Sequence, residues 1–459
     1  MLVTGLLTLQ TVFVGVGFVG GIIHVPTDAS TIQIAIEEAR PFDTIIVAPG
    51  TYFEAIGFHG KVITVQSTDP NDPSVVAATI INAGGVGPVV MFSGGEDQVN
   101  TILDGFTITG GTIGIDAHSS PAVIRHCTIR DNSTYGIKQA HGVIEDCQIL
   151  NNGHVGMRDC NGAIRRCVIR NNQYAGLEDC GGIIIDSRIE HTLGDGVAGG
   201  SIDIIRCIIA SNTGNGVYNS NDPSTTTHTG DIEQSFIVGN GGSGIRSGGG
   251  GLVENCVIAG NASHGFYESH KNVLSCTVTG NNGWGFGDHR GTISHVIIWD
   301  NPMGALSDST TPVFSGTANP YFFQPGYWDF LNNVWVDGDY HLTQNSPYID
   351  AGDPNYTNDP NAASQDIDGN PRIVGARVDI GAYEFQAACE GDDFDGDGTP
   401  DVCDRDIDGD GVPNVIDVCD DTPQGIPVDD QGRPRADLNL DCQVDLHDYA
   451  IFQNSMIGP

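Results

Sequence analysis

The sequence has few basic residues, with 19 Lys and Arg against 58 Asp and Glu in 459 residues and a formal net charge of −39. Such an excess of negative charge repels phosphate backbones, which argues against nucleic acid as a partner and makes cations the natural counterpart. Long apolar runs are also lacking after residue 23, so no membrane span is expected beyond the N-terminus. Residues 1–23 contain an uncharged apolar stretch, but no Lys or Arg precedes it. An export signal or anchor, an incomplete start and a first strand of the fold all remain open for it.

What the sequence does contain is a repeat of about 20 residues, I-x-x-C-x-I-x-x-N-x-x-x-G-I. Its first position recurs at spacings of 20, 20, 20, 20, 28, 21, 20 and 20, namely at Ile124, Ile144, Ile164, Ile184, Ile204, Ile232, Val253, Val273 and Ile293. The ninth position is Asn in eight of nine repeats, at Asn132, Asn152, Asn172, Asn212, Asn240, Asn261, Asn281 and Asn301, with Thr192 as the exception. Glycine recurs at the thirteenth position, at Gly136, Gly156, Gly176, Gly196, Gly216, Gly244, Gly265 and Gly285.

The apolar residues fall in short runs between Gly and Asn rather than three and four apart, which favours strands over helices. Stacked copies would place equivalent residues in ladders with a spacing of about 4.8 Å. Buried Asn side chains in such a ladder can bond to each other and to the turn backbone. The fold expected for residues 24–313 is therefore all-β, a parallel β-helix.

The repeat resembles the pectate-lyase-type right-handed parallel β-helix superfamily, over Ile22 to about Val313. The front of the chain is similar to the superfamily's N-terminal capping helix. Apolar residues share one helical face, at Ile32, Ala35, Ile36 and Ala39, and Ser30 or Asp28 is available as the N-cap. Phe42 stands where the family usually has Gly.

The twelve cysteines form two populations. One shares the fourth repeat position and is expected to be inert and inward-facing, at Cys127, Cys147, Cys167, Cys207, Cys256 and Cys276. Cys160 and Cys180 share another phase, and a disulfide between them remains open. Disulfides are expected among Cys389, Cys403, Cys419 and Cys442, which fits an oxidising, extracytoplasmic compartment.

Residues 389–430 carry aspartates at alternate positions around glycine turns, in two registers. The first register is Asp393, Asp395, Asp397, Asp401 and Asp404, and the second is Asp406, Asp408, Asp410, Asn414 and Asp417. Such spacing converges hard oxygen ligands on one point, as calcium requires. The segment resembles thrombospondin type 3 repeats, which implies bound calcium and disulfide-braced loops.

Residues 431–459 contain an EF-hand-like pattern. Its oxygen ligands are expected at loop positions 1, 3, 5, 9 and 12, which are Asp437, Asn439, Asp441, Asp445 and Asp448. The segment resembles one half of a dockerin module, which leaves a protein partner open. Cys442 replaces the turn glycine of that pattern.

Residues 314–388 include the segment DIDGNPRIVGARVDIGAYEF and resemble the choice-of-anchor Q region of bacterial surface proteins. Alternating aromatic and polar residues with Pro and Gly turns predict strands here. We expect these strands to close the open end of the β-helix.

Catalysis would require groups on the outer face of the β-helix, after the glycine corner. One patch combines Asp159, Glu178 and Asp179 with Lys138 and Arg158. The other, which contains the candidate catalytic residues, combines Tyr267, Glu268, His270, Asp288, His289 and Arg290. Glu268 and Asp288 share a phase, so their backbones are expected about 5 Å apart.

Two functions follow from these features. Paired carboxylates could divide acid and base roles in a glycoside hydrolase, and a histidine or tyrosine beside arginine could serve a lyase or epimerase. Polar residues on an outer face are equally typical of solvated surface. No dense aspartate cluster or lyase signature is recognisable, which favours a secreted or bacterial cell-surface protein with a structural, adhesion or glycan-binding role. A polysaccharide or cell-envelope glycan is the expected partner.

Overall fold

A computed structural model describes most of the chain. The described residues are 20–93, 96, 100–219, 230–329, 331–332, 334–356, 364–374, 377–386, 394–396, 406–412, 417–419, 421–423, 425–429, 431–438, 442–445 and 448. None of the helices in these ranges has the length and apolar character needed to cross a bilayer.

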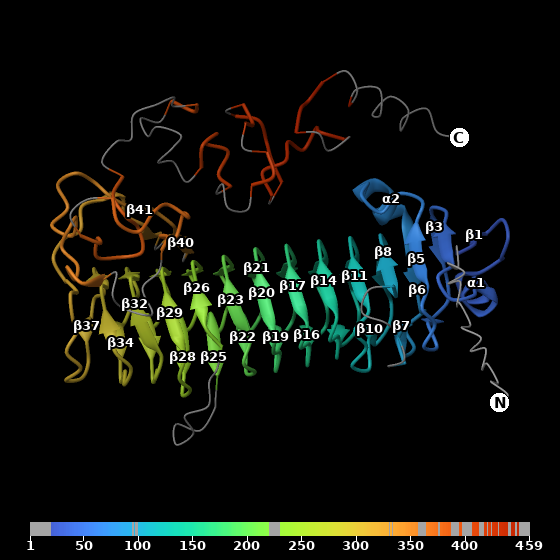
Figure 1. Ribbon diagram of the computed structural model, residues 1–459, viewed down its shortest axis with the longest axis horizontal. Coiled ribbons are helices and arrows are strands. Elements are labelled where there is room, and N and C mark those ends of the chain that lie inside the picture. The colour runs from blue at the N-terminus through green and yellow to red at the C-terminus, as the bar shows by residue number, and fades with distance from the viewer. Residues whose placement is uncertain are drawn as a thin grey trace, which may run out of the picture.

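Three parallel sheets run the length of the molecule and form a parallel β-solenoid of about 14 turns (Figure 1). Sheet A consists of β1 (Ile22–Val25), β2 (Thr44–Val47), β5 (Thr64–Ser67), β8 (Ile102–Asp104), β11 (Val123–Arg125), β14 (Val143–Glu145), β17 (Ala163–Arg165), β20 (Ile183–Ile185), β23 (Asp203–Ile205), β26 (Ile232–Glu233), β29 (Leu252–Glu254), β32 (Asn272–Leu274) and β35 (Ile293–Ser294).

Sheet B consists of β3 (Gly50–Tyr52), β6 (Thr79–Asn82), β9 (Thr107–Thr109), β12 (Thr128–Arg130), β15 (Gln148–Leu150), β18 (Val168–Arg170), β21 (Arg188–Glu190), β24 (Ile208–Ala210), β27 (Phe236–Val238), β30 (Val257–Ala259), β33 (Thr277–Thr279) and β36 (Ile297–Trp299). Sheet C consists of β4 (Ile56–Gly57), β7 (Pro88–Met91), β10 (Ile113–Asp116), β13 (Tyr135–Lys138), β16 (Val155–Arg158), β19 (Ala175–Glu178), β22 (Val197–Ala198), β25 (Val217–Asn219), β28 (Ile245–Ser247), β31 (Phe266–Tyr267), β34 (Trp284–Gly287) and β37 (Gly304–Leu306). The all-β fold and the repeat register predicted from the sequence are confirmed, since Ile124 pairs with Ile144 and Ile144 with Ile164.

The Asn ladder occupies the corner between sheets B and C. Its side chains are buried, and the Nδ2 of Asn132 donates to the Oδ1 of Asn152 at 3.1 Å, as the Nδ2 of Asn152 does to Asn172. Thr192 takes the same place, donating through Oγ1 to the Oδ1 of Asn212 at 2.9 Å. The ladder therefore satisfies polar groups inside an apolar core.

The eight cysteines of the solenoid are free and buried, as expected for those at the fourth position. Cys160 and Cys180 are likewise free, so the disulfide that the sequence leaves open is not formed. Burial raises the pKa of Cys207 to about 12, which keeps this thiol protonated and unreactive.

The N-terminal cap contains α1 (Ile32–Glu38), and Ile32, Ala35 and Ile36 are buried as predicted. Its N-cap is Thr31, whose side chain accepts a hydrogen bond from the backbone N–H of Ile34, so the expectation of Ser30 or Asp28 is wrong. Phe42 has a φ of 72°, a conformation that glycine adopts more easily, which explains the residue usual in the family. A second short helix, α2 (Pro73–Ala78), precedes β6.

Residues 314–386 form a flanking module with β38 (Phe322–Gln324), β39 (Tyr327–Asp329), β40 (Val334–Val336) and β41 (Asp339–Leu342), paired β38 with β41 and β39 with β40. The module packs mainly on the side of the solenoid, against the outer face of sheet B, where a second apolar cluster includes Phe236, Ile297, Tyr340 and Tyr383. The chain entering the module also covers the end of the solenoid, where Val313 and Gly316 form parallel bridges to Ser294 and Ile297 of the last turn, so the side contact adds to the expected closure of that end. The outer residues of the last sheet B strands are apolar except for Thr277 and Thr279, so this face has to be covered.

The buried acidic residues of this module stabilise its backbone. Asp366, Asp379 and Glu384 accept hydrogen bonds from backbone N–H groups, including those of Asn370, Phe385 and Asp379 respectively. Buried Arg372 donates to the carbonyl of Ala382 at 3.0 Å. Such bonds order a module with few strands.

Candidate calcium loops and outer-face patch

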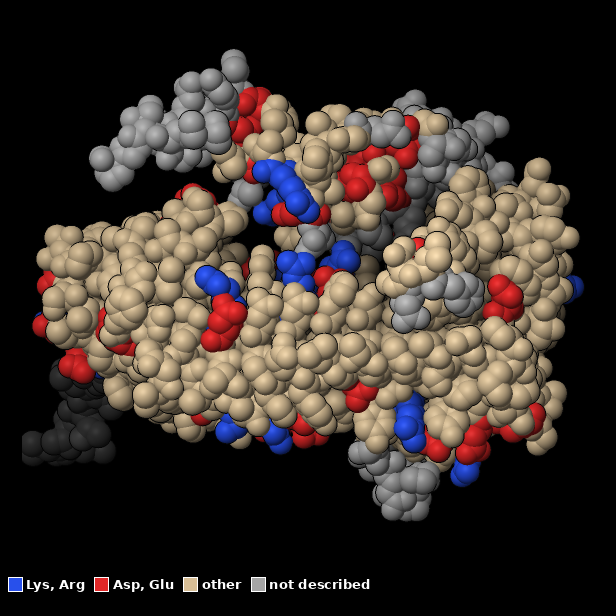
Figure 2. All heavy atoms as spheres, turned by 180° about the vertical axis from the view of Figure 1, so that it is seen from behind, with Lys and Arg blue, Asp and Glu red and all other residues tan. Residues whose placement is uncertain are grey.

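The C-terminal tail runs back over the solenoid, and its described acidic residues gather above it (Figures 1 and 2). Asp406, Asp408 and Asp410 each offer a carboxylate oxygen, and these oxygens lie within 4.8 Å of one another. Seven predicted ligands lie outside the described residues, namely Asp393, Asp397, Asp401, Asp404, Asn414, Asn439 and Asp441. The second register therefore produces the expected convergence in its first three aspartates.

Local backbone geometry produces this convergence. Gly409 has a φ of 66° between the second and third aspartates, and the carboxylate of Asp406 accepts from the backbone N–H of Gly411 at 2.9 Å. The Oδ2 of Asp408 accepts from the backbone N–H of Thr422 at 2.7 Å. A Cβ at Gly409 would come within 2.3 Å of the Oδ2 of Asp395, so the first register also reaches this loop.

The donor set fits a calcium ion. Burial raises the pKa of Asp406 to about 6, and the charges of Asp410 and Asp408 add to this effect. The Oδ2 of Asp410 is buried without a hydrogen-bond partner among the described residues. Crowded carboxylates of this kind are costly until a hard cation balances their charge.

The EF-hand-like segment closes into a loop. The carboxylate of Asp448 accepts from the backbone N–H groups of Leu438 at 2.7 Å and Asp445 at 2.8 Å, and Asp437 accepts from that of Cys442 at 2.9 Å. Cys442 has a φ of 66°, the conformation for which glycine is usual at this position.

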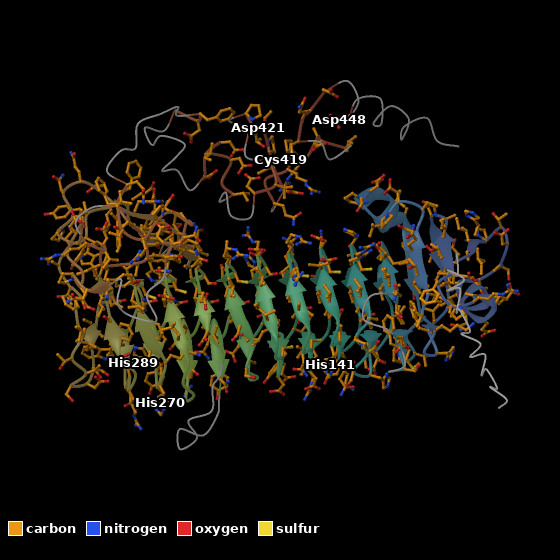
Figure 3. All side chains as sticks on the ribbon, viewed as in Figure 1. His141, His270, His289, Cys419, Asp421 and Asp448 are labelled. Carbon is orange, nitrogen blue, oxygen red and sulfur yellow. A yellow bond between two sulfur atoms is a disulfide. The ribbon has the colours of Figure 1, made fainter. Side chains whose placement is uncertain are left out.

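A disulfide between Cys419 and Cys442 joins this loop to the preceding repeat, next to Asp417 (Figure 3). One of the expected tail disulfides is thereby present. Cys389 and Cys403 lie outside the described residues.

The outer-face patch has the predicted register, because Arg246 pairs with Tyr267 and Tyr267 with Gly287. The charged groups are nevertheless paired with each other. Arg246 donates to Glu268 at 2.8 Å, and Arg290 lies 3.7 Å from Asp288. The guanidinium of Arg246 also lies between the rings of Tyr218 and Tyr267, at 5.6 and 5.3 Å from their centroids.

The same holds for the other patch. Arg158 lies 3.2 Å from Glu178 and 3.7 Å from Asp159, and it donates to the hydroxyl of Tyr135. Lys138 pairs with Arg158 in the strand register, and Asp179 follows Glu178. Both patches therefore show the charge pairing of an ordinary solvated face more than a poised acid and base.

His289 does not belong to the outer face, which corrects its place among the candidate catalytic residues. Only 2% of its surface is exposed, and its ring contacts Phe266 and Phe286 at centroid distances of 5.8 and 4.9 Å. Neither ring nitrogen has a hydrogen-bond partner among the described residues. His270 is only partly buried, in the same end of the solenoid (Figure 3).

Replacing His289 with Leu is expected to stabilise the protein, because an unbonded buried imidazole costs about 1–3 kcal/mol. Burial lowers the pKa of His289 to about 4, from 6.5. The folded state thus binds fewer protons than the unfolded state, and stability is lost as pH falls from 6.5 towards 4. Urea unfolding at pH 7 and pH 5 should show a larger gain for His289→Leu at pH 5. Equal gains at both pH values would contradict the assignment.

A further acidic group was not anticipated from the sequence. Asp203, Asp231 and Glu233 lie on neighbouring turns of sheet A, where burial and the charges of Asp231 and Asp203 raise the pKa of Glu233. The 28-residue spacing between Ile204 and Ile232 was the available signal, since it marks an insertion at this point.

Comparisons with known proteins agree with this architecture. A model of the right-handed β-helix region matches residues 65–187, and one of the thrombospondin type 3 repeat matches residues 392–425. The solenoid is therefore a right-handed β-helix, and the tail contains a repeat of a type that binds calcium. A sequence search of curated proteins finds no match.

Several solved structures are similar to this chain at low identity. The pectate lyase Pel9A is 14% identical, with a TM-score of 0.38, over 80% of this chain and 97% of that one. The A-module of the mannuronan C-5 epimerase AlgE4 from Azotobacter vinelandii is 15% identical, with a TM-score of 0.48, over 62% and 93%. The receptor-binding protein of bacteriophage Det7 is 11% identical, with a TM-score of 0.32, over 65% and 76%.

Proposed function

We propose that this chain is a secreted or cell-surface calcium-binding β-helix protein with a structural, adhesion or glycan-binding role. The observation that carries the proposal is the convergence of Asp406, Asp408 and Asp410 in a tail that lies along a rigid solenoid. Asp395, Asp406, Asp408 and Asp410 would hold the ion, which would supply the positive charge that these carboxylates require. The disulfide Cys419–Cys442 supports an extracytoplasmic location.

A polysaccharide-processing enzyme, whether lyase, hydrolase or epimerase, is the second candidate. It is favoured by Glu233, a carboxyl group with a raised pKa beside two further carboxylates on an outer face. The test is incubation of the calcium-loaded protein with uronate-containing and neutral polysaccharides, with measurement of unsaturated products and reducing ends. Activity that Glu233→Gln or Glu268→Ala abolishes would overturn the non-catalytic role.

Chelation is expected to loosen the tail without melting the solenoid. Removing calcium leaves crowded carboxylates that repel each other, whereas the solenoid is held by its own core and Asn ladder. EGTA should therefore speed proteolytic cleavage after residue 386 and leave the far-ultraviolet circular dichroism of the strands unchanged. Asp408→Ala should mimic EGTA, while Asp288→Ala serves as the matched control. An unchanged cleavage pattern after chelation would contradict calcium binding by the tail.

A further inference from the structure

A cavity of about 500 Å³ lies where three parts of the chain meet. Sheet B contributes Ile208 and Phe236, the flanking module contributes Phe323 and Trp335, and the calcium tail contributes Asp395 and Asp406. This volume is in the range of small-ligand sites. None of the residues singled out in the sequence as catalytic lines it.

The cavity has an apolar floor and an aromatic wall. Ile208 and Phe236 belong to the apolar cluster under the flanking module. Trp335 is held in place, since a Cβ at Gly260 would come within 1.9 Å of its Cδ2 and its Nε1 donates to Asp337. An apolar floor and an aromatic wall favour contact with the C–H face of a sugar ring over contact with its hydroxyls.

The charged groups around the cavity have partners within the protein, and carboxylates outnumber cations among them. Arg188, the cation among the described lining residues, lies 3.2 Å from Glu190. Asp337 accepts from the hydroxyl of Tyr340 at 2.6 Å, and Asp339 pairs with His341. Asp395 and Asp406 belong to the calcium loop. Even with calcium bound, the rim keeps a net negative charge and its cation is paired with Glu190, which disfavours an anionic ligand, while the carboxylates can accept hydrogen bonds from the hydroxyls of a neutral one.

We propose that this cavity binds a neutral saccharide, whose apolar face lies on the aromatic wall and whose hydroxyls bond to the charged rim. The calcium loop forms one wall, so binding depends on calcium. This inference rests on the glycan-binding part of the proposed function and places that binding away from the outer-face patch.

The test uses isothermal titration calorimetry with cellohexaose, maltohexaose, mannohexaose and xylohexaose, beside trigalacturonate and hexalysine, on the full chain. At least one neutral hexasaccharide should bind, and EGTA should abolish its binding. Ala210→Phe, which fills the cavity, should weaken binding at least tenfold. The matched control is Ala198→Phe on the outer face of sheet C, which should bind as the parent does. Phe323→Ala provides a second test if Ala210→Phe lowers the melting temperature, because it removes part of the aromatic wall from a half-exposed position.

Each result decides the proposal. Preference for trigalacturonate or hexalysine, or no binding of any neutral probe, would overturn it. Glycan binding that survives Ala210→Phe and Phe323→Ala would also overturn it, while leaving the proposed glycan-binding function intact. Failure of the proposed function is distinguished by a tail that does not respond to EGTA and by the absence of any glycan binding.

Discussion

Asn212→Leu is expected to lower the free energy of unfolding by at least about 3 kcal/mol, since each buried polar group left unsatisfied costs about 1–3 kcal/mol. The Nδ2 of Asn212 donates to the carbonyl of Ile189 and to the Oδ1 of Asn240, at 3.1 and 3.0 Å. Its Oδ1 accepts from the backbone N–H and the hydroxyl of Thr192. Leucine has a similar volume but fills this corner without any of these bonds. The carbonyl of Ile189 and the backbone N–H of Thr192 would lose this partner inside the core, and the Oδ1 of Asn240 would keep only the backbone N–H of residue 212.

The ladder itself supplies the matched control. Thr192 occupies the equivalent position one turn earlier, so Asn212→Thr supplies a hydroxyl that can bond within the ladder as that of Thr192 does, and should cost less than Asn212→Leu. Urea unfolding measures both, and hydrogen exchange should show the loss concentrated in the turns around 192–240. A Leu variant within about 1 kcal/mol of the parent would mean that the ladder contributes register but little stability.

The repeat phases predicted the solenoid because each position has one environment in every turn. The same phases, used fully, would have placed His289 correctly. His289 follows Asp288, which has a φ of 47°, just as Cys160 and Cys180 follow Asp159 and Asp179, each with a φ of 53°. The left-handed residue turns the chain so that the next side chain points inwards. Cys160, Cys180 and His289 are accordingly all buried.

The sequence also contains a signal for the position of the flanking module. The outer residues of sheet B change from polar to apolar at Ile208, and a strand that is apolar on both faces is covered on both faces. The hydrogen-bond partners at the corner between sheets A and B change in the same turns. Arg206 still pairs with Asp186, whereas Gln234 and Asn255 donate to carbonyls of the module. Reading the outer positions of the repeat as well as the inner ones would have predicted this side contact in addition to the expected end cap.

For the calcium tail, the sequence predicts the ligand loop but not the cavity beside it. Alternate aspartates around a glycine predict a convergent loop, because this geometry is local. The cavity could not be foreseen, since residues on its walls such as Arg188 and Trp335 lie more than a hundred residues apart in sequence. No local pattern encodes such a contact. It depends on the side packing of the module, which then fixes where the tail can lie.

Gly260→Asn is expected to displace Trp335 and loosen the flanking module. Gly260 has a φ of 58°, a conformation that asparagine tolerates. Asn171 adopts it with a φ of 55° at the equivalent corner four turns earlier. The substitution therefore tests sterics alone. A Cβ at residue 260 would come within 1.9 Å of the Cδ2 of Trp335. A Cβ added at Gly280 would likewise come within 2.3 Å of its Cη2, so the indole ring lies directly over both glycines.

Relieving this overlap requires the β39–β40 hairpin to move away from sheet B, at a cost of at least about 2 kcal/mol, as is usual for overpacking. Trp335 fluorescence should shift to longer wavelength, and limited proteolysis should cut between residues 326 and 338. His191→Asn is the matched control, because His191 has the same left-handed conformation at the same corner, with a φ of 53°, and does not line the cavity with Trp335. Equal fluorescence and cleavage for the two variants would mean that Trp335 does not hold the module. A selective loss in Gly260→Asn would show that the run of corner glycines at 239, 260 and 280 exists to receive this one side chain.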